Sequence, residues 1–127
     1  MAPRPASEDI MSDEIIDSVR SASSGTVGRA ENVARGTRTM LDSSSRPQPD
    51  ALTNSEAFLA GVSSCGVTLI EMHAKEAGVP VSGMAVTIEG VRAATAPNRF
   101  ARVHMAFEIA GVSQAQAEAL VETYRGR

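Results

Sequence analysis

The chain has 127 residues, of which 43% are hydrophobic and 21% charged, and its formal net charge is −3. This length and composition are typical of one soluble globular domain, and the acidic balance excludes a general nucleic-acid binder, which needs a basic face. The lone cysteine excludes an intrachain disulfide and a thiolate zinc cluster, and it suits a reducing compartment. The longest uncharged run, residues 57–70, is shorter than the roughly 20 apolar residues that cross a membrane. We therefore expect a cytoplasmic protein with no metal, no other cofactor, and no nucleic-acid or membrane partner.

The N-terminal part of the chain is polar before it becomes strand-like. Residues 1–24 have proline early and serine late, a composition that predicts a flexible N-terminal arm. Residues 25–127 are expected to form the folded domain. Two short strands are predicted at residues 26–33 and 37–41, with a turn at Arg35-Gly36 between them.

A long helix is predicted over residues 53–78. Thr53 with Glu56 three residues later fits a capping box, and Gly78 supplies a stop. An apolar stripe with 4-3-4-3 spacing follows the segment: Phe58, Val62, Cys65, Leu69 and Met72. Because almost no position before Glu71 is strongly polar, we expect this helix to be buried on most of its sides.

A strand hairpin and a second helix follow. The outgoing strand alternates at Met84, Val86 and Ile88. The return strand places a second apolar row on one face: Ala101, Val103, Met105, Phe107 and Ile109. Ser113 with Gln116 fits another capping box, which predicts a C-terminal helix. The order of strands, long helix, hairpin and helix predicts an α+β fold with antiparallel strands packed on a central helix.

Cys65 has two interpretations. A free cysteine on an apolar helical stripe is most often a small core residue. A reactive thiol instead needs room and a positive charge that favours the thiolate. Gly61, four residues earlier, leaves room beside the sulfur because helical side chains lean toward the N-terminus. The helix dipole acts only over the first turn, so the charge must come from another side chain.

The candidates for that charge are few. His73 is two turns, roughly 12 Å, along the axis from Cys65, and His104 is on the polar face of its strand. The remaining candidates are arginines of the N-terminal strands and the following loop: Arg29, Arg35, Arg38 and Arg46. Glu56 is the candidate carboxylate, with the alternative that it serves only as half of the cap. No phosphate-binding loop, serine elbow or metal-ligand spacing is present.

Two segments resemble a known family. Residues 54–90, "NSEAFLAGVSSCGVTLIEMHAKEAGVPVSGMAVTIEG", are similar to the central helix and following strand of the OsmC/Ohr family. Residues 100–127, "FARVHMAFEIAGVSQAQAEALVETYRGR", resemble the next strand, a Gly-Val-Ser step and a helix of that family. The resemblance covers about residues 50–127. It implies an OsmC-like α+β fold with a long buried central helix, assembled as an intertwined homodimer with its sites at the interface.

The resemblance also implies a function. Members of this family are thiol-dependent peroxidases that reduce organic hydroperoxides in the oxidative stress response. Cys65 would be the peroxidatic cysteine, held by Glu56 at the helix start and by an arginine of the N-terminal strands, Arg35 or Arg38. An external thiol reductant would restore the thiol, a dihydrolipoyl group in the hydroperoxide branch.

Two departures from the family pattern motivate an alternative function. The second cysteine of the family is expected in a Cys-Pro step just after "ETYRGR", so the C-terminal part of the family fold is expected to be missing from residues 25–127. The hydroperoxide branch places its glutamate ten residues before the cysteine, where this chain has Ser55, one position before Glu56. The alternative is a non-enzymatic dimer of the same fold that binds a small hydrophobic ligand, with Cys65 as inert packing.

Overall fold

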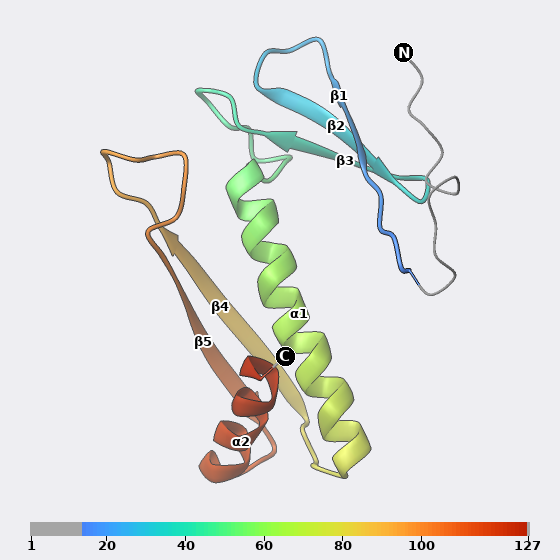
Figure 1. The fold of residues 1–127 in the computed structure, drawn as a ribbon, viewed down its shortest axis with the longest axis vertical. Coiled ribbons are helices and arrows are strands. Elements are labelled where there is room, and N and C mark those ends of the chain that lie inside the picture. Colours follow the sequence, from blue (N-terminus) through green and yellow to red (C-terminus); the bar gives the residue numbers. More distant parts are fainter. Residues whose placement is uncertain (1–13, 127) are drawn as a thin grey trace. The chain divides into compact units, whose positions relative to one another are not determined.

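The computed structural model describes residues 14–126, and these form three strands, a helix, two strands and a helix in chain order (Figure 1). This is the α+β order that the sequence predicts. Contacts divide the chain after Ala51 into two compact units, which are described one at a time.

The first unit is an antiparallel sheet in the order β1-β2-β3. Its strands span Arg20–Ser23 (β1), Arg29–Ala34 (β2) and Thr37–Asp42 (β3). The last two match the predicted strands to within a few residues. β1, however, lies in the segment predicted to be a flexible arm, and its residues are paired in register with β2. All four residues of β1 are exposed. Their sequence, Arg-Ser-Ala-Ser, lacks the alternation of apolar and polar residues from which a strand is recognised.

The turn between β2 and β3 occurs where the sequence predicts it. Arg35 has φ of 51° and Gly36 has φ of 82°, and the two form the whole connection between paired Ala34 and Thr37. Two consecutive positive φ angles are what a type I′ hairpin turn requires. Arg35 is therefore at the exposed tip of a tight hairpin.

Asp42 anchors the loop that follows β3. Its carboxylate accepts hydrogen bonds from Arg29 Nη1 at 2.7 Å and from the amides of Ser44 at 3.0 Å and Gln48 at 2.9 Å. The hydrogen bonds from Ser44, the Gln48 amide and Arg29 hold the pKa of the fully buried Asp42 carboxyl well below its usual range. Arg29 also forms an ion pair with Asp50 at 3.0 Å. Because two carboxylates engage it, Arg29 is a structural residue and a poor candidate for holding a thiolate.

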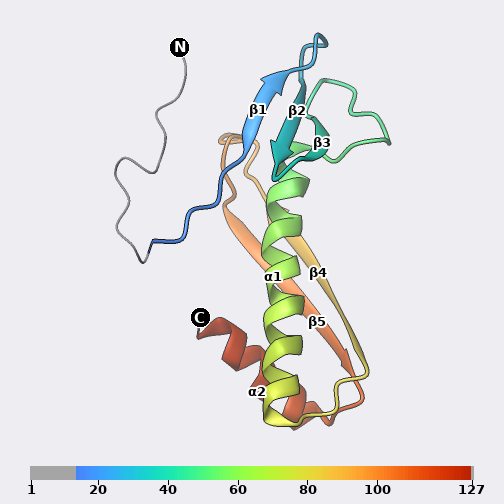
Figure 2. The ribbon, with the colours of Figure 1, turned by 90° about the vertical axis from the view of Figure 1, so that its right-hand side faces the viewer.

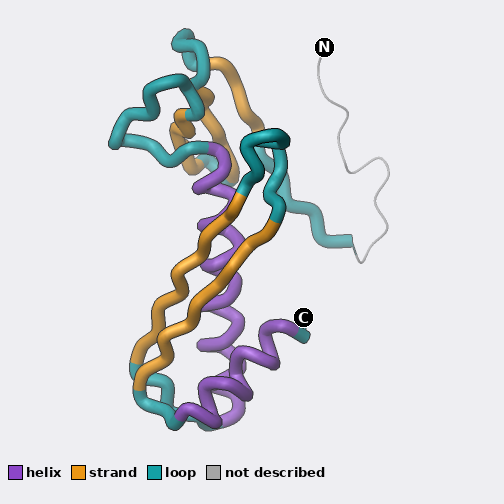
Figure 3. Tube along the Cα trace, turned by 90° about the vertical axis from the view of Figure 1, so that its left-hand side faces the viewer, coloured by secondary structure: helices purple, strands orange, loops and turns teal. Residues whose placement is uncertain are grey.

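The second unit consists of α1 (Asn54–Ala77), β4 (Gly83–Val91), β5 (Arg102–Ala110) and α2 (Gln114–Arg125). β4 and β5 form one antiparallel hairpin, paired along their full lengths. The hairpin runs alongside α1, and α2 packs near the C-terminal half of α1 (Figures 1 and 3).

Both predicted helix caps are confirmed. The Thr53 hydroxyl accepts from the Glu56 amide at 3.1 Å, and the Thr53 amide donates to Glu56 Oε1 at 2.9 Å. Gly78 ends α1 in the left-handed conformation, with φ of 70°. At α2 the same reciprocal pair joins Ser113 and Gln116, at 3.2 and 2.9 Å. These local hydrogen bonds satisfy amide groups at the helix starts that have no partner inside the helix.

The core of the second unit lies where α1, α2 and the hairpin meet. Ile70 and Ala74 of α1 and Leu120 of α2 are 1%, 2% and 3% exposed. Partly buried side chains surround them: Val79, Val81, Met84, Phe107, Ile109, Val121 and Tyr124. Gly66, Ile70 and Ala74 are the buried residues of α1, four positions apart, so they form one narrow face of the helix.

The opposite side of α1 is open in this chain, although the sequence predicts burial on most sides. Phe58 and Met72 are each 60% exposed, and Cys65 is exposed as well. Figure 2 views α1 from the side away from β4 and β5. The predicted apolar stripe is therefore only partly covered within the chain, and the fully buried face of α1 is that of Gly66, Ile70 and Ala74. Apolar residues surround the helix, so periodicity alone does not identify which side meets the hairpin.

Within residues 14–126, α1 is the one helix long and apolar enough to cross a membrane by length and composition. The core helix of a soluble protein meets the same criteria, and Ile70 and Ala74 pack against the hairpin and α2. We interpret α1 as such a core helix.

Replacing Ile70 by alanine is expected to destabilise the fold by about 2–4 kcal/mol, because Ile70 is the most buried apolar side chain of the core. Chemical denaturation followed by circular dichroism measures the change. Val103→Ala is the control, since Val103 is 44% exposed and its loss should cost well under half as much. Equal effects of the two substitutions would contradict this assignment of the core.

Candidate functional site

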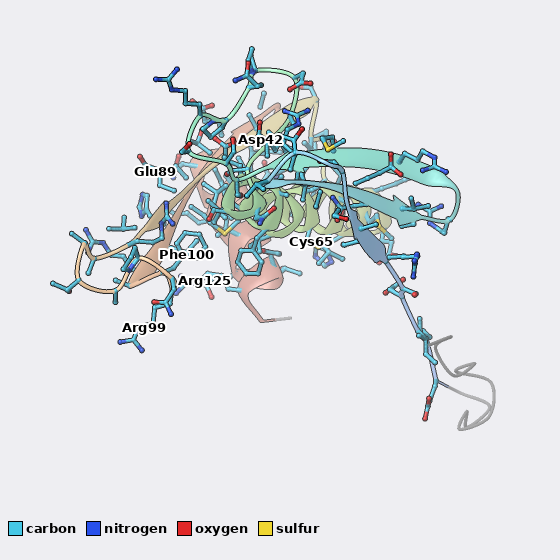
Figure 4. The ribbon with its side chains drawn as sticks, turned by 90° about the horizontal axis from the view of Figure 1, so that it is seen from above. Asp42, Cys65, Glu89, Arg99, Phe100 and Arg125 are labelled. Carbon is cyan, nitrogen blue, oxygen red and sulfur yellow. The ribbon has the colours of Figure 1, made fainter. Side chains whose placement is uncertain are left out.

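Cys65 is exposed near the middle of α1, so it is not a core residue of this chain (Figure 4). The interpretation as buried packing therefore does not hold within the chain. Its surroundings are open, as the sequence predicts: apart from the neighbouring backbone of α1 itself, no described atom lies within 4 Å of the position that a Cβ on Gly61 would take. The thiol thus has both solvent access and free space on its N-terminal side.

The residues around Cys65 on this face are apolar. Phe58, Cys65 and Met72 are seven positions apart, which brings them onto one side of the helix with about 20° of drift per step. Together with half-buried Val62 and Leu69 they form what we call the Cys65 strip. Its 4-3 spacing is that of a helix–helix packing seam. Phe58, Cys65 and Met72 of this strip are exposed, and clustered exposed apolar side chains are typical of interaction surfaces.

Glu56, the predicted carboxylate, does not approach Cys65 in this chain. Its side chain accepts from the Thr53 amide and completes the cap. It lies nine residues before Cys65, which is two and a half turns and about 13 Å along the axis, on the other side of the helix. Ser55, ten residues before Cys65, is nearer to the thiol's side of α1 but carries no charge.

Arg35 and Arg38, the predicted cations, both belong to the first unit. Arg35 is exposed at the β2–β3 turn. Arg38 is 68% exposed and pairs with Glu31 on the neighbouring strand. Since Cys65 belongs to the second unit, a contact between the thiol and either arginine stays a prediction. Arg46 is also exposed in the first unit, in the loop after β3.

The histidines do not form a cysteine–histidine pair with Cys65. His73 is half-buried two turns further along α1, and His104 is exposed on β5 opposite Glu89 of β4. Among residues 14–126, no three or more histidine, cysteine or acidic side chains gather in a way that could hold a metal ion.

The loop between β4 and β5 brings further residues to the start of α1 that no sequence pattern singled out. The Phe100 ring stacks on Phe58 with 6.0 Å between ring centroids. Beside it is a hollow of about 190 Å³, whose lining includes Ser55, Arg92 and Arg99. Figure 4 shows Arg99 extending from the loop next to Phe100. Residues 92–101 hold two arginines and no acidic residue, a feature of the sequence that could have drawn attention to them.

Residues 47–127 match the family model described as OsmC-like protein. No curated protein matches the sequence.

Solved structures with the same fold include three bacterial proteins. An OsmC-like protein from Mycoplasma pneumoniae superposes with a TM-score of 0.75 at 13% identity, covering 92% of this chain and 84% of that chain. An organic hydroperoxide resistance protein OsmC from Legionella pneumophila gives 0.68 at 23% identity, covering 88% and 83%. The organic hydroperoxide resistance protein OhrB of Bacillus subtilis gives 0.60 at 15%, covering 88% and 84%. At these identities the likeness establishes a shared fold.

Proposed function

This chain belongs to the OsmC-like protein family, and from that premise we propose that it is a thiol-dependent peroxidase that reduces organic hydroperoxides. The observation that carries the proposal is the position of Cys65, exposed on the central helix, within an apolar strip and beside the space left by Gly61. An apolar surface around a thiol suits a peroxide with an organic group. The names of the Legionella and Bacillus structures are consistent with this role.

The proposed reaction has two stages. The Cys65 thiolate attacks the terminal peroxide oxygen, so that an S–O bond forms and the O–O bond breaks. The organic oxygen leaves as an alkoxide, takes a proton and becomes the alcohol, while the sulfur is oxidised to sulfenic acid. An external dithiol, for which we propose a dihydrolipoyl group, attacks the sulfur and releases water. Its second thiol then cleaves the mixed disulfide, which restores Cys65 and leaves the reductant oxidised.

We further propose that the working form is a homodimer in which the partner covers the Cys65 strip. Each chain leaves two large apolar side chains of that strip, Phe58 and Met72, mostly exposed, and the 4-3 spacing suits helix packing. The site would then lie at the interface. Glu56, Arg35 and Arg38 stay our proposed thiolate-supporting residues. Because Glu56 faces away from Cys65 of its own chain, a contact between the two would come from the partner.

The cytoplasm is the compartment that we propose for this reaction. A lone cysteine stays a thiol in a reducing environment, and thiol reductants are available there.

The alternative function is a dimer of the same fold that binds a small hydrophobic ligand without chemistry. The observation in its favour is that Glu56, the predicted charged partner within the second unit, forms the helix cap and faces away from Cys65 of its own chain. The two functions differ in the reactivity of the thiol.

Stoichiometric oxidation distinguishes these functions. We expect cumene hydroperoxide to oxidise Cys65 about a hundredfold faster than it oxidises free cysteine, which corresponds to a barrier lower by about 2.7 kcal/mol. Stopped-flow loss of thiol, with mass spectrometry of the dimedone adduct, measures the rate and identifies the sulfenic acid. A rate equal to that of free cysteine would instead favour the ligand-binding function.

A further inference from the structure

A groove of about 600 Å³ opens between β5 and α2 in the second unit, and we call it the α2 groove. Half-buried apolar side chains from both elements form its floor: Phe107, Ile109, Ala117 and Val121. Exposed polar side chains form its rim: Glu108, Gln114, Glu118 and Glu122. The groove therefore combines an apolar floor with three carboxylates and has no lysine or arginine in its lining.

The negative charge of this rim is largely uncompensated. Glu118 accepts a hydrogen bond from Gln114 Nε2 at 3.2 Å, and this neutral donor leaves the charge in place. Glu122 pairs with Arg125 at 3.1 Å, but both side chains are mostly exposed, so water screens the pair. Among residues 14–126 no ion pair involves Glu108 or Glu118.

The opposite charge gathers in and beside the β4–β5 loop. Residues 92–102 contain Arg92, Arg99 and Arg102 and no acidic residue, and all three arginines are exposed. None of them forms an ion pair within residues 14–126. Arg92 Nη1 donates to the backbone oxygen of Pro97 at 3.0 Å, which holds the loop without neutralising the guanidinium.

The two charged regions lie at opposite ends of one hairpin and cannot meet within a chain. Arg102 begins β5 and Glu108 is six residues later, so about 20 Å of extended strand separates them. β4 and β5 are paired along their full lengths, which keeps the ends apart. Figures 1 and 3 show the loop at one end of the hairpin and α2 at the other. Such a hairpin is complementary to a second copy arranged head to tail.

We propose that the α2 groove binds the β4–β5 loop of a second copy of this chain, with the arginines of the loop against the glutamates of the rim. The apolar floor covers Pro97 and the alanines of the loop, so burial of apolar surface adds to the attraction between charges. A second copy is the occupant that we favour, because both complementary surfaces are present in the described residues.

This contact is heterologous. Each copy that has filled one groove still presents a free loop and a free groove of its own, so the contact repeats along an open row of copies. It differs from the proposed homodimer, which uses the Cys65 strip, and it depends neither on that dimer nor on the proposed peroxidase activity.

Sedimentation velocity over a concentration series tests the contact at about 20 mM and about 500 mM salt. At low salt we expect assemblies larger than the species present at high salt, because salt screens attraction between exposed charges. Two charge-reversal variants, Glu108→Lys/Glu118→Lys in the groove and Arg99→Glu/Arg102→Glu in the loop, should each weaken this association about tenfold or more. An equal mixture of the two variants should restore it, because each loop then meets a groove of opposite charge.

The control changes the net charge by the same amount outside the groove. Glu76 ends α1 and Glu89 is on β4, both are exposed, and neither lines the α2 groove. Glu76→Lys/Glu89→Lys should leave the low-salt association within about twofold of wild type. The neutral variants Glu118→Gln and Arg99→Gln repeat the test with smaller changes, and thermal melting verifies that each variant is folded.

Several outcomes would overturn the proposal. One is a wild-type protein that sediments identically at both salt concentrations. Another is an equal loss in the control, which would mean that net charge alone governs the association. If the mixture of charge-reversal variants does not associate, the loop and the groove are not partners. If an oligoarginine peptide binds the groove of a wild type that forms no larger assemblies, the occupant is another protein and the second copy is wrong.

Discussion

Cys65→Ser is expected to abolish the turnover of organic hydroperoxides, with a loss of about a thousandfold or more. Cys65 is the single cysteine of the chain. A serine hydroxyl is a far weaker nucleophile and cannot form a sulfenic acid. The substitution changes one atom at an exposed position, so the fold should be retained. The assay follows the consumption of cumene hydroperoxide with a dithiol such as dihydrolipoamide as reductant.

Ser64→Ala serves as the matched control for this substitution. Ser64 is the exposed neighbour of Cys65 on α1, and its hydroxyl donates no hydrogen bond to any of residues 14–126, so its loss should leave the rate within about twofold. Equal rates for wild type and Cys65→Ser would show that the peroxidase proposal is wrong. Equal losses of activity in both variants would mean that activity is sensitive to any change on this helix surface. The loss in Cys65→Ser would then not be evidence for a specific role of the thiol.

Met72→Glu is expected to convert the proposed homodimer into a monomer at micromolar concentration. Met72 is 60% exposed in the single chain and lies on the Cys65 strip, so in the dimer its side chain would be covered by the partner. Burying an unpaired carboxylate there is unfavourable, and we expect the dissociation constant to rise at least about a hundredfold, or about 2.7 kcal/mol. Sedimentation velocity over a concentration series measures the change. Activity should fall with it if the site is at the interface.

The control for dimerisation introduces the same charge elsewhere. Thr87 is exposed on β4 and does not belong to the Cys65 strip, so Thr87→Glu should leave the association unchanged. A wild-type protein that sediments as a monomer would refute the dimer directly. If Met72→Glu and wild type associate equally, the interface lies on another surface than the Cys65 strip.

Short-range features were predictable because their causes are local. The capping boxes of Thr53 with Glu56 and of Ser113 with Gln116 are each contained in four consecutive residues, and both helix starts are where they predict. The β2–β3 turn follows from a glycine beside Arg35, and the hairpin follows from strict alternation. The order of these elements, and the resemblance they support, needed no coordinates.

The candidate site was only partly predictable. Cys65 and the free space at Gly61 could be identified from spacing along one helix. The role of Glu56 could not be decided, because the same residue fits both a cap and a site; the structure shows the cap formed and the side chain on the other side of α1 from Cys65. The stack of Phe58 on Phe100 joins residues 42 positions apart, a relation that no local pattern contains.

The sequence by itself determined where both helices begin, where α1 ends, the α+β order and the candidate nucleophile, since each depends on neighbouring residues and their hydrogen bonds. Tertiary structure alone decided three matters. It made β1 a strand through backbone pairing with β2, it selected Gly66, Ile70 and Ala74 over Cys65 as the packed face of α1, and it brought Arg92 and Arg99 beside that helix. The physical reason is common to all three. Long-range packing chooses among helix faces that are equally apolar, and it places segments whose sequence carries no local structural pattern.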